Sequence, residues 1–389
     1  MTDTLRILER LIAFDSVSLT PNRDLMDYVA EELAAVGVTP LLLWNEDGTR
    51  GNLYATIGPD DRAGVMLSGH TDVVPVVGQN WTRPPFRLTR EGNRLYGRGT
   101  ADMKGFVAAA LAAALRAARR DLALPLHLAF SYDEEIGCVG VRSLIDHLNQ
   151  APVLPRFCIV GEPTSMEVVT GHKGKTGFRI TCQGREAHSA LPSLGINAIH
   201  MAAACVAEVA ALQERIKQSG PRDEGFDEPT TTLQVSVIEG GTALNIVPNR
   251  CELKAEIRTL AQDDPAALLK ELADRFQAIA RAASDEAGSA MIGIEIIAAY
   301  PGLDVPGDAE VVRFLKGLTG ANSTTKVAFG TEGGLFHANA GVPTAICGPG
   351  SMAQGHKPDE FVTEDQLARC DRMLDRLIGR LDAGELPVS

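Results

Sequence analysis

Cysteine is scarce in this sequence and occurs in no pairing typical of a disulfide framework or a zinc site. Among 389 residues there are 7 cysteines, and none belongs to a C-x-x-C motif. An odd, scattered set of this kind in an intracellular protein consists most often of small core residues. We therefore predict no disulfide and no cysteine-ligated metal.

The sequence also lacks a long apolar run and an excess of positive charge. Its longest apolar run, 106–115, is too short to span a bilayer, and Asp3, Glu9 and Asp15 interrupt the N-terminal turns where a secretion signal needs apolar residues. Fifty acidic residues against 37 basic ones give a formal net charge of −13, which argues against nucleic acid and anionic membranes as partners. We expect a cytoplasmic protein.

The overall composition is that of a globular protein with more than one core. Apolar residues make up 45% of the sequence, and the mean hydropathy is close to zero. A chain of 389 residues is long for a single hydrophobic core. Two domains are therefore the starting expectation.

The apolar run 63–67 is followed directly by two side chains that suit a metal site. We expect the run to be a buried strand, so that His70 and Asp72 lie where the strand ends. Spaced two residues apart, they leave the strand on one face, and a carboxylate there can orient an imidazole through its second nitrogen, as metal ligation requires. Taken alone, the pair is explained better by a polar strand end in water.

Acidic side chains occupy the next two element ends. Asp102 precedes an alanine- and leucine-rich helix, where an N-cap role is the simpler explanation. Glu134 and Glu135 follow a buried strand predicted at 126–130. On extended backbone, neighbouring side chains point in opposite directions, so we expect the two glutamates to have different roles.

Two later strand ends complete the set. The predicted strand at 157–161 ends at Glu162, and the strand at 343–347 leads into a loop that contains His356. A doubly wound α/β sheet brings such ends to one edge. Histidines and carboxylates are suitable ligands for a borderline divalent ion, and there are enough of them here for two ions. The sequence therefore predicts a metal site.

A nucleotide site is the competing interpretation of two glycine-containing segments. The segment 171–176 resembles the tail of a phosphate-binding loop, but Val169 occupies the place of the required earlier glycine. Gly97 and Gly99 begin a dinucleotide-binding pattern whose third glycine is replaced by Asp102. Both nucleotide interpretations are weak.

The pattern of expected elements changes at about residue 175. Between 175 and 300 the order is βαββαβ, typical of a small antiparallel sheet covered by two helices, with an exposed loop at 219–229. We predict strands at 178–182, 231–238, 250–259 and 292–300, and helices at 195–216 and 265–283. Residues 1–174 and 301–389 are expected to form an α/β domain, with a mixed but mostly parallel sheet flanked by helices. The range 175–300 would be an inserted, ferredoxin-like α+β domain.

Several segments together resemble, in order and spacing, the co-catalytic zinc amidohydrolase family. They are SGHTDVVP (68–75), GRGTADMKG (97–105), DEE (133–135), GEPT (161–164) and the loop of His356. That family includes aminoacylases, glutamate carboxypeptidases, succinyl-diaminopimelate desuccinylases and acetylornithine deacetylases. Within it, FGTEGG (329–334) and GPGS (348–351) with HKPDE (356–360) most resemble the acetylornithine deacetylases.

The resemblance implies two divalent ions, zinc in the first place, with cobalt or manganese as alternatives. Asp102 would bridge the ions. The remaining ligands would be His70 and Glu162 for one ion, and Glu135 and His356 for the other.

The resemblance also implies roles for the residues around these ligands. Asp72 would orient His70. Glu134 would be the general base that takes a proton from water and delivers it to the leaving amine. Ions of this kind polarise the amide carbonyl, so that no side-chain nucleophile is needed.

The inserted domain is expected to act as a lid and dimerisation domain. His188, in GREAHSA (184–190), would reach the active site of the partner subunit of a homodimer and stabilise the oxyanion. Asn245 and Arg258 would hold the substrate carboxylate, and the planar guanidinium of arginine suits that role. Without the resemblance, His188 would be a surface histidine in a turn and Arg258 a strand arginine in a salt bridge.

The expected reaction is hydrolysis of the amide of a small N-acyl amino acid, with N-α-acetyl-L-ornithine as the leading substrate and arginine biosynthesis as the pathway. A desuccinylase or a general aminoacylase keeps the chemistry and changes the acyl group. A relative that binds an amino acid without catalysis is the alternative from another class. The complete set of ligands, together with Glu134, speaks against that last alternative.

Overall fold

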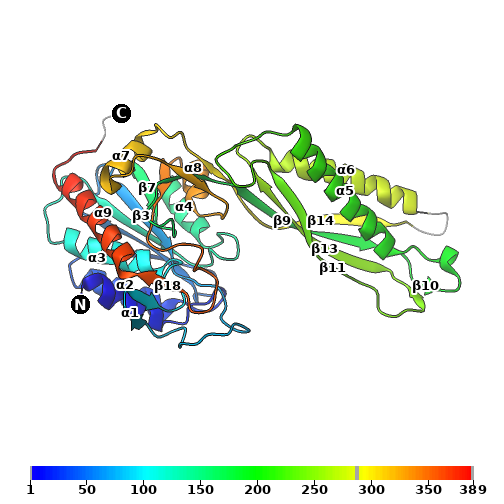
Figure 1. The fold of residues 1–389 in the computed structure, drawn as a ribbon, viewed down its shortest axis with the longest axis horizontal. Coiled ribbons are helices and arrows are strands. Elements are labelled where there is room, and N and C mark those ends of the chain that lie inside the picture. Colours follow the sequence, from blue (N-terminus) through cyan, green and yellow to red (C-terminus); the bar gives the residue numbers. More distant parts are fainter. Residues whose placement is uncertain (1, 285–288, 387–389) are drawn as a thin grey trace. The chain divides into compact units, whose positions relative to one another are not determined.

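The computed structural model describes residues 2–284 and 289–386 and divides the chain into two compact units (Figure 1). Unit 1 comprises Met1–Gly171, Leu303–Lys326 and Thr331–Ser389. Unit 2 comprises His172–Gly302 and Val327–Gly330. Each unit is described by itself below.

Unit 1 is built on a mixed sheet whose strand order is β1-β2-β6-β3-β7-β17-β8-β15, with β16 paired to β8. The strands are β1 (Leu41–Trp44), β2 (Gly51–Ile57), β3 (Val65–His70), β6 (Leu126–Ser131), β7 (Phe157–Val160), β8 (Val169–His172), β15 (Leu303–Asp304), β16 (Thr325–Val327) and β17 (Thr344–Ile346). The neighbours β6, β3, β7 and β17 are parallel, whereas β1, β2 and β8 pair antiparallel to their neighbours. The carboxyl ends of the central strands therefore meet at one edge, as the sequence predicts.

The helices of unit 1 pack on this sheet or on one another. They are α1 (Asp3–Ala13), α2 (Arg23–Ala34), α3 (Lys104–Ala117), α4 (Val141–Gln150), α7 (Glu310–Thr319), α8 (Gly333–Asn339) and α9 (Glu364–Asp382). Helix α3 packs on β3 and β6 and also against α1 and α9, and it is buried almost throughout. Its many alanines allow this close approach, because a helix that is apolar all round is stable only when it is covered on every side.

The short elements around the sheet edge were not predicted from the sequence. Among these are α4, α8 and a separate sheet with the order β18-β5-β4, formed by β4 (Thr89–Glu91), β5 (Arg94–Tyr96) and β18 (Phe361–Thr363). Strands of three residues are too short to show a periodic pattern. The small sheet matters for the site, because it joins the segment before Asp102 to the segment after His356.

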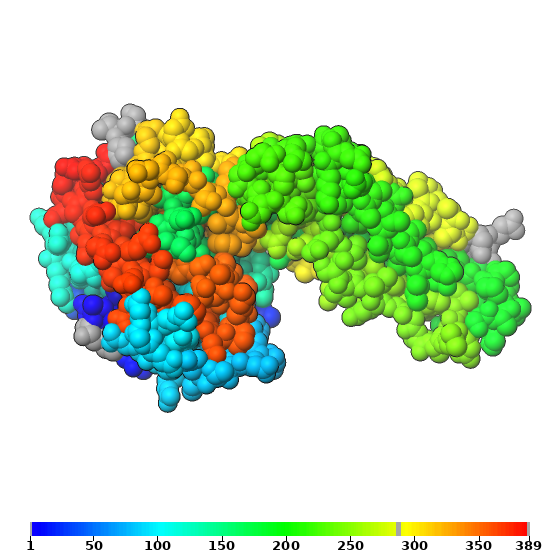
Figure 2. Space-filling model, viewed as in Figure 1, coloured from blue at the N-terminus to red at the C-terminus, as the bar shows by residue number. Residues whose placement is uncertain are grey.

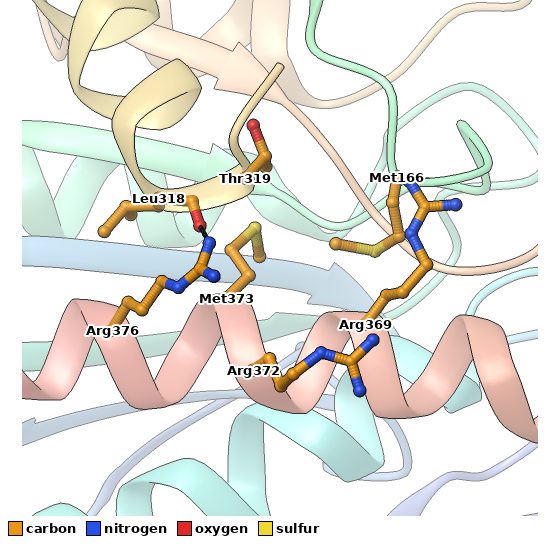
Figure 3. A pocket seen from close by; sticks show the side chains of 7 residues that line it. All are labelled: Met166, Leu318, Thr319, Arg369, Arg372, Met373 and Arg376. Atoms are coloured by element: carbon orange, nitrogen blue, oxygen red, sulfur yellow. Dashed lines mark hydrogen bonds between the residues drawn. The ribbon is translucent and has the colours of Figure 1, made fainter.

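The end of α7 is tied to α9 by a side chain. The Arg376 guanidinium donates to the carbonyl of Leu318 at 2.7 Å, which satisfies one of the unpaired carbonyls at the helix terminus (Figure 3). Arg369 and Arg372 line the same hollow of about 140 Å³. The contact fixes the C-terminal helix against the helix that precedes β16.

Unit 2 is a four-stranded antiparallel sheet with the order β11-β13-β9-β14, covered by two helices. Its elements are β9 (Gly174–Gln183), β10 (Ala187–His188), η1 (Pro192–Leu194), α5 (Ala198–Ser219), β11 (Thr232–Gly240), β12 (Ile246–Val247), β13 (Arg250–Thr259), α6 (Pro265–Ala283) and β14 (Met291–Tyr300). The order of the main strands and helices is βαββαβ. The predicted α+β fold class is thereby confirmed.

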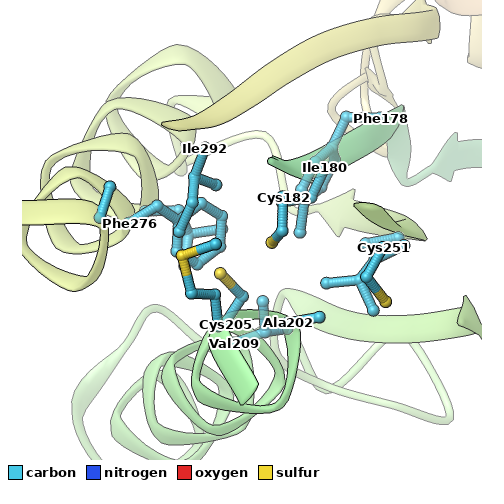
Figure 4. Packing of buried hydrophobic residues seen from close by; sticks show 14 of the residues in the cluster. Phe178, Ile180, Cys182, Ala202, Cys205, Val209, Cys251, Phe276 and Ile292 are labelled. Atoms are coloured by element: carbon cyan, nitrogen blue, oxygen red, sulfur yellow. The ribbon is translucent and has the colours of Figure 1, made fainter. Parts of the chain in front are cut away.

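The core of unit 2 lies between the sheet and the two helices (Figure 4). Phe178 and Ile180 of β9, Phe276 of α6 and residues of α5 all belong to this buried cluster. Cys182, Cys205 and Cys251 belong to this core, and all seven cysteines are buried free thiols. The prediction that the cysteines are core residues is confirmed.

No helix within 2–284 or 289–386 combines the length and the apolar character that a membrane crossing requires.

His127 on β6 gives unit 1 an acid-sensitive element. The side chain is 6% exposed, and its Nδ1 lies 3.0 Å from both the Tyr54 hydroxyl and the Thr56 hydroxyl on β2. Burial lowers the pKa of His127 to about 4. Below the ordinary histidine pKa the unfolded chain therefore binds a proton that the folded chain does not, so stability falls as pH falls from about 6.5 towards 4.

We predict that His127→Gln removes this part of the pH dependence. Between pH 7 and pH 5 the free energy of unfolding of the wild type should fall by about 2 kcal/mol more than that of the variant. Urea unfolding at both pH values measures the difference, and other groups cancel because they titrate in both proteins. The exposed His337→Gln should behave like the wild type. Equal losses in wild type and His127→Gln would contradict the prediction.

Candidate metal centre

His70 is the last residue of β3, and its two ring nitrogens face different partners. Nδ1 lies 2.9 Å from the backbone carbonyl of Asp72 and 3.5 Å from its carboxylate. Because a carbonyl only accepts, Nδ1 carries the proton. Nε2 lies 3.1 Å from Asp102 and 4.0 Å from Glu162. In the neutral ring, its lone pair is thus directed at two carboxylates, as in histidines that bind metal.

A second group forms on the other side of Asp102. The Nε2 atom of His356 lies 3.1 Å from Asp102 Oδ2 and 3.0 Å from Glu135 Oε2. His70 faces the other oxygen of the same carboxylate, Oδ1. Asp102 therefore presents one oxygen to each histidine.

The five predicted ligands form two overlapping groups that share Asp102. One is His70, Asp102 and Glu162, and the other is Asp102, Glu135 and His356. Within each group the potential ligand atoms all lie within 4.8 Å of one another. The first group is buried, whereas the His356 side chain in the second is 44% exposed. The second group is therefore the one open to solvent.

The carboxylates of the centre strongly perturb one another. Burial raises the pKa of Glu135 to about 7 and that of Glu162 well above its usual value, and in both cases the negative Asp102 adds to the rise. Asp102 behaves in the opposite way: burial alone would raise its pKa, but hydrogen bonds with His356 and His70 hold it below the usual range. The same contacts with Asp102 and Glu135 raise the pKa of His356 to about 10.

This donor set fits divalent cations. A cation among these side chains favours the ionised form of the carboxylates and the neutral form of the imidazoles. Nitrogen and oxygen ligands, with one carboxylate shared, suit zinc and other borderline ions. The sequence predicts candidate ligands at strand ends and at one helix start, and the family resemblance selects five of them; the structure brings all five together.

Asp72 has more partners than the sequence analysis assigns to it. Its Oδ1 accepts the backbone N–H of Glu134 at 3.0 Å and its Oδ2 accepts that of Glu135 at 3.3 Å. The Ser18 hydroxyl donates to Oδ2 at 2.7 Å. The carboxylate thus fixes the turn that carries both glutamates, while the closest contact of His70 is to the Asp72 carbonyl. Sequence spacing could not reveal the turn contacts.

One premise drawn from the sequence is wrong, and one alternative considered there is excluded. Glu134 and Glu135 do not lie on extended backbone; they follow β6 in a tight turn in which the N–H groups of Gly137 and Cys138 both bond to the Glu134 carbonyl at 2.8 Å. Asp102 is not an N-cap, because α3 begins at Lys104 after Met103 and has no side-chain cap. The Asp102 side chain is instead engaged by the two histidines.

Comparisons with known proteins bear on this geometry. A model of Peptidase family M20/M25/M40 matches residues 66–380. The chain belongs to this family. The acetylornithine deacetylase of Myxococcus xanthus is 35% identical over 394 residues, covering 99% of this chain and all of the relative, and that of Pasteurella multocida (strain Pm70) is 33% identical over 369 residues, covering 93% and 92%. The family prediction made from the sequence is confirmed, and the chain is an M20 family hydrolase.

The fold of M20 proteins is also that of this chain. The M20 family metallo-carboxypeptidase Sso-CP2 of Sulfolobus solfataricus superposes with a TM-score of 0.77 at 20% sequence identity, covering 99% of this chain and all of the other. At this identity the likeness shows the fold alone.

One buried acid near the centre of this M20 chain had no role predicted from the sequence. Glu332, next to the start of α8, is 1% exposed and accepts hydrogen bonds from the hydroxyls of Ser131 on β6 and Ser68 on β3, the latter at 3.2 Å. Burial raises the pKa of Glu332 to about 7. It joins the ends of two strands that carry site residues. Its position in the FGTEGG segment was the available signal, but the two serine partners come from distant parts of the sequence.

The three predicted residues of the inserted domain do not come together within unit 2. His188 on β10 pairs with Ile246 on β12, the Ser189 N–H donates to the Asn245 carbonyl at 3.0 Å, and the side chains of His188 and Asn245 are exposed. Arg258 lies near the other end of β13, where it donates to the Tyr300 hydroxyl at 3.2 Å and to Glu256 at 3.3 Å.

The separation can be estimated from strand geometry. β13 starts at Arg250, beside the end of β9 that leads to β10. At about 3.3 Å per residue, Arg258 lies roughly 26 Å further along the strand. His188 and Asn245 therefore form one cluster, and Arg258 belongs to a different end of the unit.

Proposed function

We propose that this M20 hydrolase removes the acyl group from an N-acyl amino acid, with N-α-acetyl-L-ornithine as its substrate and L-ornithine and acetate as products. It would act in the cytoplasm as a homodimer, in arginine biosynthesis. The observation that carries the proposal is the pair of ligand groups that share Asp102, with Glu134 in the same turn as the ligand Glu135 and with its backbone held by Asp72. The choice of acetyl as the acyl group and of ornithine as the amino acid is supported by the relatives named acetylornithine deacetylase.

In this proposal, Glu134 moves the proton. Water attacks the amide carbonyl carbon, Glu134 takes the proton from the water, and the same carboxylic acid returns it to the nitrogen as the C–N bond breaks. Asp72 holds the Glu134 backbone, and the Cys138 thiol lies 3.3 Å from the Glu134 carboxylate. Divalent ions held by His70, Asp102 and Glu162 and by Asp102, Glu135 and His356 would supply polarisation of the carbonyl and a lowered pKa of the water.

The arrangement of unit 2 supports the proposal of a homodimer. A substrate the size of an N-acetyl amino acid is far shorter than the roughly 26 Å of strand that separates Arg258 from the end of β13 near His188 and Asn245. Within one chain, Arg258 and the pair of His188 and Asn245 are therefore too far apart to contact the same substrate molecule. We assign Arg258 to the carboxylate in its own subunit, and His188 with Asn245 to the active site of the partner subunit.

Two other functions have to be compared with this proposal. A desuccinylase or general aminoacylase shares the centre and differs in the acyl pocket. A non-catalytic binder would need no base, yet Glu134 is present in the turn that carries the ligand Glu135, and Asp72 holds the backbone of that turn.

The substrate proposal predicts a pattern of turnover. The purified protein should release acetate from N-α-acetyl-L-ornithine at a higher kcat/KM than from other N-acetyl amino acids, and should act more slowly on N-formyl and N-succinyl compounds. Excess chelator should abolish turnover while the circular dichroism spectrum changes little, because the apolar core of the sheet does not include the ligands. Preference for the succinyl compound would favour the desuccinylase, and full activity at verified near-zero metal content would refute the metal-dependent mechanism.

The two adjacent glutamates should respond differently to the same change. Glu134→Gln keeps the size of the side chain but cannot accept the proton, so turnover should fall about 10²–10⁴-fold with both ions still bound. Glu135→Gln should lose an ion, because it removes a ligand beside His356. The metal content of both variants shows which glutamate is the ligand. Loss of an ion in Glu134→Gln and not in Glu135→Gln would show that the roles are reversed.

The crossing of His188 between subunits can be tested by mixing two inactive variants. His188→Ala should lower turnover about 10²–10³-fold, as loss of an oxyanion donor does, with the metal content unchanged. Subunit exchange between His188→Ala and Glu134→Gln dimers should recover activity, because one site of the mixed dimer has Glu134 from the first chain and His188 from the second. No recovery despite exchange verified by mass spectrometry would place His188 outside the partner's site.

A further inference from the structure

The carboxylate of Glu360 is buried beneath the loop that carries Asp102. Glu360 is 1% exposed, and four donors converge on its two oxygens. They are the N–H groups of Ala101 at 2.9 Å and Asp102 at 3.1 Å on Oε1, and the N–H of Gly99 at 3.1 Å and the Arg98 guanidinium at 2.7 Å on Oε2. One side chain thus accepts three hydrogen bonds from backbone N–H groups of residues 99–102, the segment that ends at the shared ligand.

The backbone of Glu360 belongs to the other ligand loop. Its carbonyl accepts the N–H of Gly97 at 3.0 Å, and the next residue, Phe361, pairs with Tyr96 where β18 meets β5. His356 lies four residues earlier in the same segment. Glu360 therefore joins the loop of Asp102 to the loop of His356 through both its side chain and its backbone.

The His356 loop requires such support. His356 has a φ of 60° and Asp359 a φ of 55°, a left-handed conformation that non-glycine residues adopt at a cost and keep only where surrounding contacts hold them. Gln79 supplies one contact, because its amide donates to the His356 carbonyl at 2.9 Å. The oxygen of the same amide accepts from Arg98 at 2.5 Å. The network thus runs from the His356 backbone through Gln79 and Arg98 to Glu360.

General stability is a poor explanation for this arrangement. A buried arginine–carboxylate pair seldom adds net stability, because removing both charges from water offsets their attraction. A carboxylate is nevertheless the side chain that can accept on both oxygens at once, whereas a glutamine would turn an N–H₂ group towards two of the four donors. The need to hold the four donors around the ligand loops therefore explains a carboxylate at this position better than a contribution to stability does.

We propose that Glu360, with Arg98 and Gln79, is a positioning group that fixes Asp102 and His356 relative to each other and so sets the affinity of the ion held by Asp102, Glu135 and His356. This inference rests on the proposed metal centre. His70 ends β3 and Glu162 follows β7, and among the described residues neither has a hydrogen bond to Glu360, Arg98 or Gln79. The ion held by those two residues should depend on Glu360 less strongly, through Asp102 alone.

The test is a titration of the metal-free full-length protein with Co²⁺, followed by calorimetry and by the absorption of the bound ion. The wild type should bind two ions, and His356→Ala identifies the step that belongs to the exposed group. Glu360→Gln should weaken that step about 10–100-fold, the range found for groups that orient metal ligands. The other step should change less. Glu310→Gln is the matched control, since Glu310 pairs with Arg156 at 2.6 Å on α7, remote from the ligand loops.

Each result has a definite meaning. Two unchanged steps in Glu360→Gln would overturn the inference alone, whereas a wild type that binds no Co²⁺ would overturn the metal centre as well. Equal weakening of both steps with a lower melting temperature of the metal-free variant would show a general folding role instead. If Glu360→Gln does not fold, the same titration is carried out on Gln79→Ala, because this change removes the contact to His356 without altering the buried carboxylate. Unchanged binding in Gln79→Ala would then refute the network.

Discussion

The site depends on one shared carboxylate. Asp102 directs one oxygen to His70 and the other to His356, so the two ligand groups exist only if the loop before α3 is fixed relative to β3 and to the His356 loop. Loops position side chains less rigidly than strands do. The contacts to Glu360 and the packing of α3 against β3 explain why this loop can nevertheless act as the common reference point.

The candidate ligands were predictable where the sequence pattern and the fold follow the same rule. His70 and Glu162 follow apolar runs, and the carboxyl ends of parallel strands meet at one edge of a doubly wound sheet, so their proximity could be expected. His356 was accessible in the same way, through the strand before its loop. The general arrangement of unit 2 was readable from its alternating helical and strand segments.

The supporting residues were not predictable, for a physical reason. Glu332 meets serines on β3 and β6, and Glu360 meets backbone groups more than 250 positions away in the chain. A single buried acid carries no periodic signal, and its partners are defined only once the chain has folded. The turn at Glu134 and Glu135 was missed because the apolar run of β6 gives no sign of the left-handed residue, Asp133, with a φ of 53°, at which the extended backbone stops.

The unfavourable free energy of ionising the buried carboxylates arises at the ends of the strands, whereas the stability of the sheet comes from apolar side chains along them. Burying several carboxylates beside only two imidazoles raises the pKa of Glu135 and Glu162, which means that ionising them in the bare protein is unfavourable. The strands beneath are filled by aliphatic and aromatic side chains that contribute burial independent of those charges. Because each ligand comes from a different element end, the electrostatic strain is spread over several loops and concentrated in none. Because the ligands come from several loops, the proposed centre depends for its affinity for a cation on how these loops are placed relative to one another. The apolar core contributes to this affinity only by holding the loops.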